Sequence, residues 1–183
     1  MRRWTRAIRT ELPVLSVAFF RNLNQGQRAS PTSAVLFAAF EQAGASNVAG
    51  YRGNGTVIFD AEHPKQCAET VAGMLSARSP WSDDVFVRQA DWVAQLGGAL
   101  AARSPEPASR TEISFFDESF VLEGLPLAGV RSTIVEGGPG YAITVNDLDK
   151  EGHATPSIER LLGAPVTSRS LGTLVGVAGR LIS

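Results

Sequence analysis

Two arginine-bearing loops are the part of this sequence whose residue types are best suited to chemistry. "FFRNLNQGQ" places Arg21 directly after an apolar run, and Asn24 and Gly26 follow it. "TSRS", near the other end of the chain, holds Thr167 and Arg169 just before an apolar segment of helical pattern. Guanidinium groups bind phosphate or carboxylate through paired N–H bonds, and N–H groups at a helix start favour anions. If the two loops meet, these five residues predict a site for a small anionic or phosphate-bearing ligand.

A structural interpretation of the same loops competes with the ligand site. In it, Arg21 pairs with a carboxylate, and the asparagines hold a turn by bonding to nearby backbone. The residue types alone favour this interpretation by a small margin. Whether a shared site exists depends on whether Arg21 and Arg169 lie close together in the fold.

Other catalytic and metal-binding patterns have little support in the sequence. Cys67, the single cysteine, shares a predicted helix face with Val71 and Met74, which favours a buried structural thiol over a nucleophile. With two histidines, no paired-ligand spacing and no glycine-rich phosphate loop, we expect neither a metal nor a cofactor. The acidic segment 147–153 has Ile158 where a calcium loop needs its last glutamate. No nucleophile or general base stands out, so whether the protein is an enzyme stays open.

Composition bounds the class of protein. The 183 residues are 44% hydrophobic and 19% charged, with a net charge of −1, which is typical of a globular chain with a substantial core. This charge disfavours nucleic acid as a partner, because phosphate backbones are bound by clustered lysines and arginines. The apolar run 14–20 is too short to span a membrane, and a lone cysteine suits a reducing compartment. We therefore expect a cytoplasmic protein without membrane contact.

Strand and helix patterns alternate in the first half of the chain. A buried strand, a capped helix, a hairpin of two strands, a second helix and a fourth strand are predicted at residues 14–20, 30–44, 47–61, 63–79 and 83–89. This βαββαβ order is that of a ferredoxin-like unit, a four-stranded antiparallel sheet with two helices on one face.

The second half begins with a third helix, which ends in a Pro/Ser/Glu stretch that suggests a boundary. Three strands, a short helix and a final helix follow, at residues 111–116, 129–137, 140–147, 155–163 and 169–183. We therefore expect an α+β protein with a ferredoxin-like subdomain at 13–103 and a smaller mixed α/β subdomain at 104–183 packed on it. Residues 1–12, which are basic, are expected to be an N-terminal extension, with a nucleic-acid-binding arm as the alternative.

Two alternatives to ligand binding come from the predicted elements. A nucleic-acid-binding module would stack bases on an exposed face of the first sheet, although the strands lack the aromatic signature of such modules. A structural or oligomerising protein would use the final helix, whose Gly172, Gly176 and Gly179 weaken it and require docking, with tertiary packing as the simpler reason. In the second case the partner would be another copy of this chain.

Three motifs resemble the DUF1697 family, bacterial proteins of unknown function. "FFRNLNQGQ" resembles the family's "LRGINVGG", "NVAGYRGNGTVIFDA" resembles "VRTYIQSGNVVF", and "LLGAPVTSRSLGTL" resembles "LGVPATTRNWNTV". The resemblance runs from about Val14 to Leu181 and implies an α+β fold with a ferredoxin-like first half. The chain departs from the family pattern at Asn22, Asn54, Thr56, Ser170, Leu171 and Gly172. Most of these are positions suspected of binding, where the changes would alter or remove a family-wide ligand.

Overall fold

A computed structural model describes residues 12–103 and 108–182 of the chain. Residues 1–11, and with them the interpretation as a nucleic-acid-binding arm, lie outside the described residues. Within the described ranges the chain has a mixed α/β architecture of five helices and two antiparallel sheets, as expected of an α+β protein. None of these five helices is both long enough and apolar enough to span a membrane.

The first sheet is built around a strand that is buried on both faces. Its elements, with their connecting helices, are β1 (Val14–Phe20), α1 (Ser33–Gln42), β2 (Ser46–Tyr51), β3 (Thr56–Ala61), α2 (Pro64–Arg78) and β4 (Val85–Gln89). The strands are all antiparallel to their neighbours, in the order β2-β3-β1-β4. Residues 17–20 of β1 are completely buried, because Ala18 and Phe20 pack in the core with α1 and α2 while Phe19 packs on the opposite side.

The second sheet contains three expected strands and two that the sequence pattern does not predict. Its elements are β5 (Thr111–Phe115), β6 (Leu127–Ala128), β7 (Ser132–Gly138), β8 (Tyr141–Asn146), α4 (Ala154–Leu162) and β9 (Thr167–Ser170). The strand order is β6-β7-β8-β5-β9, again antiparallel throughout. β9 is the "TSRS" segment, and its pairing with β5 sets Ser168 opposite Ser114. Arg169 therefore projects from a strand rather than from a loop.

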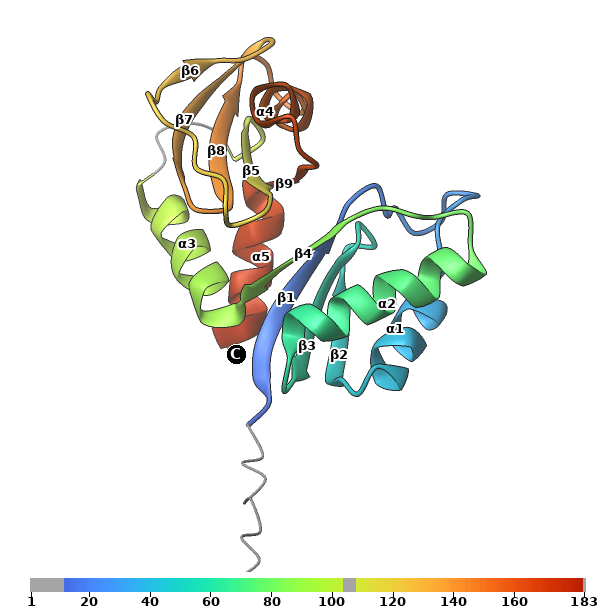
Figure 1. Cartoon of the computed structure of the whole chain (residues 1–183). Coiled ribbons are helices and arrows are strands. Elements are labelled where there is room, and N and C mark those ends of the chain that lie inside the picture. Colours follow the sequence, from blue (N-terminus) through green and yellow to red (C-terminus); the bar gives the residue numbers. More distant parts are fainter. Residues whose placement is uncertain (1–11, 104–107, 183) are drawn as a thin grey trace, which may run out of the picture.

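Two helices, α3 (Ala90–Arg103) and α5 (Leu171–Ile182), join the sheets. Figure 1 shows both helices on the side of the second sheet that faces β1. Their apolar residues share one core with side chains from both sheets. In that core Phe19 of β1 stacks on Phe115 of β5, with ring centroids 3.9 Å apart and planes inclined by 11°. This core fixes the end of β1 relative to β9.

The glycines of α5 differ in their surroundings. A Cβ at Gly176 would collide with the Tyr51 hydroxyl, whereas a Cβ at Gly172 or Gly179 would meet no heavy atom within 4 Å. Among the described residues, Gly176 is thus the only glycine of this helix where a neighbouring side chain leaves no room for a Cβ. Since that neighbour, Tyr51, belongs to β2 of the same chain, tertiary packing accounts for this glycine without a second copy.

The alternative of a nucleic-acid-binding module requires an exposed face on the first sheet. α1 and α2 pack on one face. On the other face Phe19 and Ile58 are buried in the core shared with α3 and α5. The centre of this face, around Phe19 and Ile58, is therefore covered.

Candidate functional site

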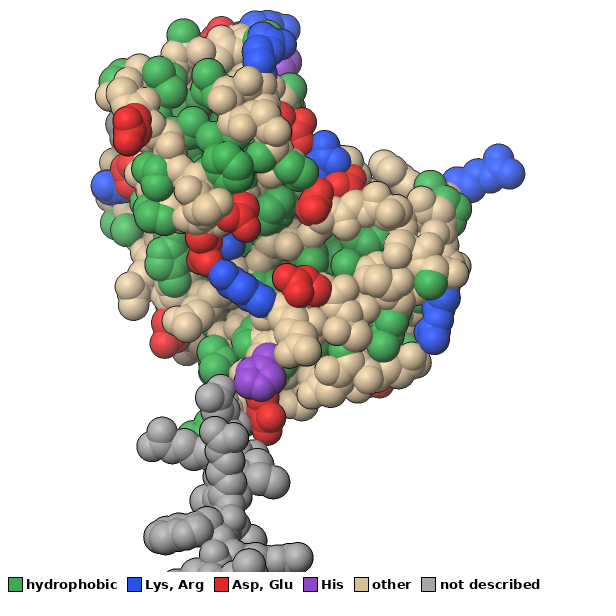
Figure 2. Space-filling view, viewed as in Figure 1, with side chains coloured by type: hydrophobic (Ala, Val, Ile, Leu, Met, Phe, Trp, Pro, Cys, Tyr) green, Lys and Arg blue, Asp and Glu red, His purple; other side chains and the backbone are tan. Residues whose placement is uncertain are grey.

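A polar pocket of about 260 Å³ lies where the two sheets meet. It is formed by the end of β1 and the loop after it, the turn between β2 and β3, the start of α4, β9 and the start of α5. Its lining residues are Phe20, Arg21, Asn22, Leu23, Asn24, Asn54, Thr155, Val166, Thr167, Ser168, Arg169, Ser170 and Thr173. Two guanidinium groups line it, and no aspartate or glutamate is among these residues. Figure 2 shows that charged side chains gather along the boundary between the two parts of the molecule.

Arg21, at the end of β1, is neutralised by two carboxylates. Its Nη1 donates to both carboxylate oxygens of Asp83 at 2.7 and 2.8 Å, and its Nη2 donates to Glu159 Oε1 at 2.8 Å. Glu159 belongs to α4, so this arginine also ties the first sheet to the second. The hydrogen bond to Asp83 is the largest contribution that raises the pKa of Arg21 above its ordinary value. Arg21 therefore pairs with carboxylates, as the structural interpretation of its loop predicts.

Arg169, on β9, is buried and bonds only to neutral groups. Its Nε donates to Thr56 Oγ1 at 2.9 Å, its Nη1 to Thr167 Oγ1 and the Ser168 carbonyl, and its Nη2 to the Phe20 carbonyl, each of the last three at 2.8 Å. Within residues 12–103 and 108–182 no carboxylate forms an ion pair with it. Burial lowers the pKa of Arg169 to about 10, so it stays charged at neutral pH.

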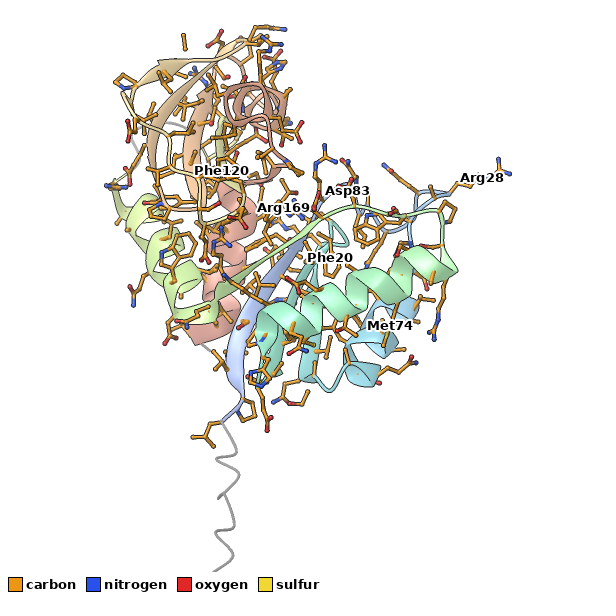
Figure 3. The ribbon with its side chains drawn as sticks, in the orientation of Figure 1. Phe20, Arg28, Met74, Asp83, Phe120 and Arg169 are labelled. Carbon is orange, nitrogen blue, oxygen red and sulfur yellow. The ribbon has the colours of Figure 1, made fainter. Side chains whose placement is uncertain are left out.

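The bonds of Arg169 leave part of its donor capacity unused. A guanidinium carries five N–H hydrogens, and the four bonds above use one on Nε, two on Nη1 and one on Nη2. The second hydrogen of Nη2 has no partner among the described residues. Figure 3 shows Arg169 near the end of β1, on the same side of the molecule as Phe20 and Asp83.

Hydroxyl groups and a helix start complete the pocket. The Thr173 N–H donates to Ser170 Oγ at 3.2 Å, which makes Ser170 the N-cap of α5. The first backbone N–H groups of a helix carry partial positive charge, which favours an anion beside them. Deeper in the second sheet, Ser168 Oγ lies 2.7 Å from both Ser114 Oγ and Thr155 Oγ1. These contacts hold the hydroxyls of the lining in fixed positions.

The structure brings together four of the five residues that the sequence nominates. Arg21, Asn24, Thr167 and Arg169 all line the pocket. Thr167 does so with a hydroxyl that accepts a bond from Arg169. Gly26 does not line it; its φ of +92° serves the turn of the loop, and a Cβ there would meet open space.

Several lining residues were not nominated as site residues from the sequence. Asn54 stands out in the sequence only as a departure from the family motif, and nothing in the sequence pattern singles out Thr155, Ser168 or Thr173. Three positions where the chain departs from the family motifs, Asn22, Asn54 and Ser170, lie in this lining. A fourth, Thr56, bonds to Arg169. The departures were therefore a signal for the pocket.

A larger cavity, of about 430 Å³, lies beside another buried arginine, Arg88. Here the charge has a counterpart, because Glu118 Oε1 lies 3.9 Å from Arg88 Nη1 and Glu118 also forms an ion pair with Lys65. Arg88 Nη2 donates to the Phe116 carbonyl at 2.7 Å and also bonds the Gly140 carbonyl, so this arginine holds backbone segments together. We therefore take the smaller pocket as the candidate site.

Cys67 and the acidic loop offer no competing site. Cys67, on α2, is buried in the core that α1 and α2 share with the first sheet, and burial raises the pKa of its thiol, which disfavours a reactive thiolate. In the acidic segment, Glu151 pairs with Arg131 at 2.8 Å and contacts His153. Among the residues that the structure describes, no cluster of three or more His, Cys, Asp or Glu side chains is arranged to hold a metal ion.

Comparisons with known proteins give a family and a fold. Among solved structures, the conserved bacterial protein SP0830 from Streptococcus pneumoniae is similar, with a TM-score of 0.58 and 17% identity over 92% of this chain and 99% of that chain. Identity this low supports the fold alone. No curated protein matches the chain significantly. A family model described as "Protein of unknown function (DUF1697)" matches residues 15–130, a range that contains two of the three motifs and excludes the one at 161–174. Because this model covers more than half of the chain, the protein belongs to the DUF1697 family, as its motifs predicted.

Proposed function

We propose that this protein binds a small anionic or phosphate-bearing ligand in the pocket between the end of β1 and the start of α5. The observation that carries the proposal is Arg169, a buried cation with no carboxylate partner among the described residues. Burying an unpaired charge is costly, and neutral hydrogen-bond acceptors recover only part of the lost hydration. A bound anion would supply the missing opposite charge.

The proposed ligand contacts differ between the residues of the site. Arg169 would bind the anion through its free Nη2 hydrogen, together with the start of α5, which lines the same pocket. Asn24, exposed at the rim, would contact the ligand from the first loop. Arg21 would act mainly by holding the pocket wall, because its charge is already paired. Gly26 lies outside the lining and is assigned no contact.

A charge introduced at the N-cap of α5 tests the proposal without disturbing the fold. Aspartate caps a helix as well as serine does, so Ser170→Asp keeps the cap of α5 while adding a negative charge to the pocket lining. We expect this variant to lose at least tenfold in affinity for inorganic phosphate, measured by isothermal titration calorimetry at constant ionic strength, with little change in melting temperature.

Ser76→Asp is the matched control. Ser76 is exposed on α2 and absent from the pocket lining, so the same substitution changes the net charge equally. Its phosphate affinity should equal that of the wild type. A wild-type protein that does not bind phosphate or sulfate, or equal loss in both variants, would overturn the proposal.

We also propose a finer division of the fold, with a ferredoxin-like subdomain at 13–103 and a second subdomain at 104–183. The element order β1-α1-β2-β3-α2-β4 and the strand order β2-β3-β1-β4 support the first, and the separate sheet of β5 to β9 supports the second. A reducing, cytoplasmic location is proposed on the single, buried cysteine.

A further inference from the structure

The walls of the candidate pocket are polar almost throughout. Its three apolar lining side chains, Phe20, Leu23 and Val166, are at most 1% exposed, so they offer no surface to a ligand. The remaining lining consists of two guanidinium groups, three side-chain amides and five hydroxyl groups. A nucleobase or an aromatic acid would need an aromatic or aliphatic face to pack against, and this lining provides none.

Asn54, in the turn between β2 and β3, has an acceptor without a partner. Its Oδ1 is buried and accepts no hydrogen bond from any described residue. A buried acceptor left unpaired costs free energy that a donor from a ligand would recover. Because the side chain forms no hydrogen bond to another described residue, a small rotation of the terminal amide can turn Oδ1 toward a ligand at little cost.

A ligand hydroxyl is the group that fits this wall. Hydroxyls both donate and accept hydrogen bonds, so they match side-chain amides and hydroxyls alike, whereas phosphate oxygens without protons only accept. The anionic group is already assigned to Arg169 and the start of α5, so Asn54 would meet another part of the same molecule. The volume of about 260 Å³ limits that molecule to a small one.

We infer that the ligand is a small polyhydroxylated phosphate, of the sugar-phosphate class, whose hydroxyls bind Asn54 while its phosphate binds Arg169. This inference rests on the proposed anion binding and adds the chemistry of the rest of the ligand. Asn54 is a specificity residue in it: it distinguishes ligands that bear hydroxyls from those that bear only the phosphate.

The test compares two phosphate monoesters that share a phosphate group and differ in hydroxyls. Glucose 6-phosphate and ethyl phosphate are titrated into the full-length wild type, Asn54→Ala and Gln27→Ala by calorimetry. Gln27 is exposed in the neighbouring loop outside the lining and serves as the matched control. We expect wild type and Gln27→Ala to bind glucose 6-phosphate about tenfold more tightly than ethyl phosphate. In Asn54→Ala this ratio should fall to about threefold or less, with unchanged affinity for ethyl phosphate.

Each other outcome has a defined meaning. Equal affinity of the wild type for the two esters, with both lost in Ser170→Asp, overturns this inference and leaves anion binding standing. A preference for glucose 6-phosphate that survives Asn54→Ala overturns the role of Asn54. Tighter binding of adenosine monophosphate than of glucose 6-phosphate overturns the sugar-phosphate assignment in favour of a nucleotide. Failure of every phosphate compound to bind overturns the proposed function and this inference together.

Discussion

Arg21 and Arg169 line one pocket, yet their guanidinium groups have partners of different charge. Arg21 is about a quarter exposed and has two carboxylates within 2.8 Å. Arg169 is 7% exposed and bonds to two hydroxyls and two backbone carbonyls. The more deeply buried cation is thus the one without an opposite charge, the reverse of what stability alone would favour.

Both arginines also connect the two sheets, in opposite directions. Arg21, directly after β1, donates a hydrogen bond to Glu159 on α4. Arg169, on β9, donates hydrogen bonds to the Phe20 carbonyl and to Thr56 of the first sheet. Since the two make comparable structural connections, structure alone does not explain why only one has carboxylate partners. The proposed function accounts for this difference: the charge of Arg21 serves the fold, and the charge of Arg169 would be available to a ligand.

The largest effect is expected from removing the unpaired charge. Arg169→Met leaves Thr56, Thr167 and the Phe20 carbonyl without their buried donor, so the free energy of unfolding should fall by about 2–4 kcal/mol. The variant should also lack the rise in melting temperature that the proposed function predicts for the wild type in phosphate. Chemical denaturation and thermal melts with and without phosphate measure the two effects separately.

Arg28→Met is the matched control for this substitution. Figure 3 shows Arg28 extending into solvent from the first loop, away from the pocket. Its replacement removes the same charge and should change neither stability nor the response to phosphate by a measurable amount. If Arg169→Met folds and keeps the full phosphate response, the proposed distinction between the two arginines is wrong.

The sequence predicted the first sheet well because its signals are local. The apolar run 14–20 coincides with β1, and the Asn/Gly turn correctly separates β2 from β3. The helix predicted at 30–44 begins slightly before α1, because the residue that accepts the bond of the first turn is Thr32. β9 was missed because "TSRS" has no apolar alternation; it is a strand only because it pairs with β5, a contact between residues far apart in sequence.

The site was predictable in part for the same reason. Arginine, asparagine and threonine could be nominated from their types, and four of the five nominated residues line the pocket. The carboxylates that pair with Arg21 could not be identified, because Asp83 reaches it through the pairing of β4 with β1 and Glu159 through the packing of the two sheets. Local sequence patterns carry no information about contacts between residues that are far apart in the chain.

An intermediate effect is expected at the carboxylate that neutralises Arg21. Burial alone would raise the pKa of Asp83, but hydrogen bonds from Arg21, the Asp84 N–H and Asn22 outweigh burial and lower it. The ionised form therefore contributes stability above the ordinary aspartate pKa, near 4, and this contribution is lost as pH falls through the lowered value. Asp83→Asn should be less stable than wild type by about 1–2 kcal/mol at pH 7, between the values for exposed and buried ion pairs.

Urea denaturation at pH 7 and at pH 3 checks both the size and the sign. The difference in unfolding free energy between wild type and Asp83→Asn should shrink at pH 3, because pH 3 lies below the ordinary aspartate pKa of about 3.9, so that part of the contribution of the ionised form is lost. Asp147→Asn, at an exposed position in the acidic loop, is the control and should differ little from wild type at either pH. A difference that is the same at both pH values would show that the Arg21–Asp83 pair does not stabilise the fold through its charge.

The smallest effect is expected from neutralising Glu159. This substitution tests the contrast between Arg21 and Arg169 most directly, because it removes one of the charges that pair with Arg21. Its Oε1 accepts bonds from Arg21 Nε, Arg21 Nη2 and the Val166 N–H, and Glu159→Gln retains an oxygen that can accept them. The substitution therefore removes a negative charge next to the pocket with little change in geometry. If paired charge is what makes Arg21 unavailable, phosphate should bind about three- to tenfold more tightly in calorimetry, because Arg21 then contributes part of its charge.

Glu41→Gln, exposed on α1, is the matched control and should leave the phosphate affinity unchanged. Equal phosphate affinity in wild type and Glu159→Gln would mean that the carboxylates do not withhold Arg21 from the ligand, and the contrast between the two arginines would then be one of burial alone.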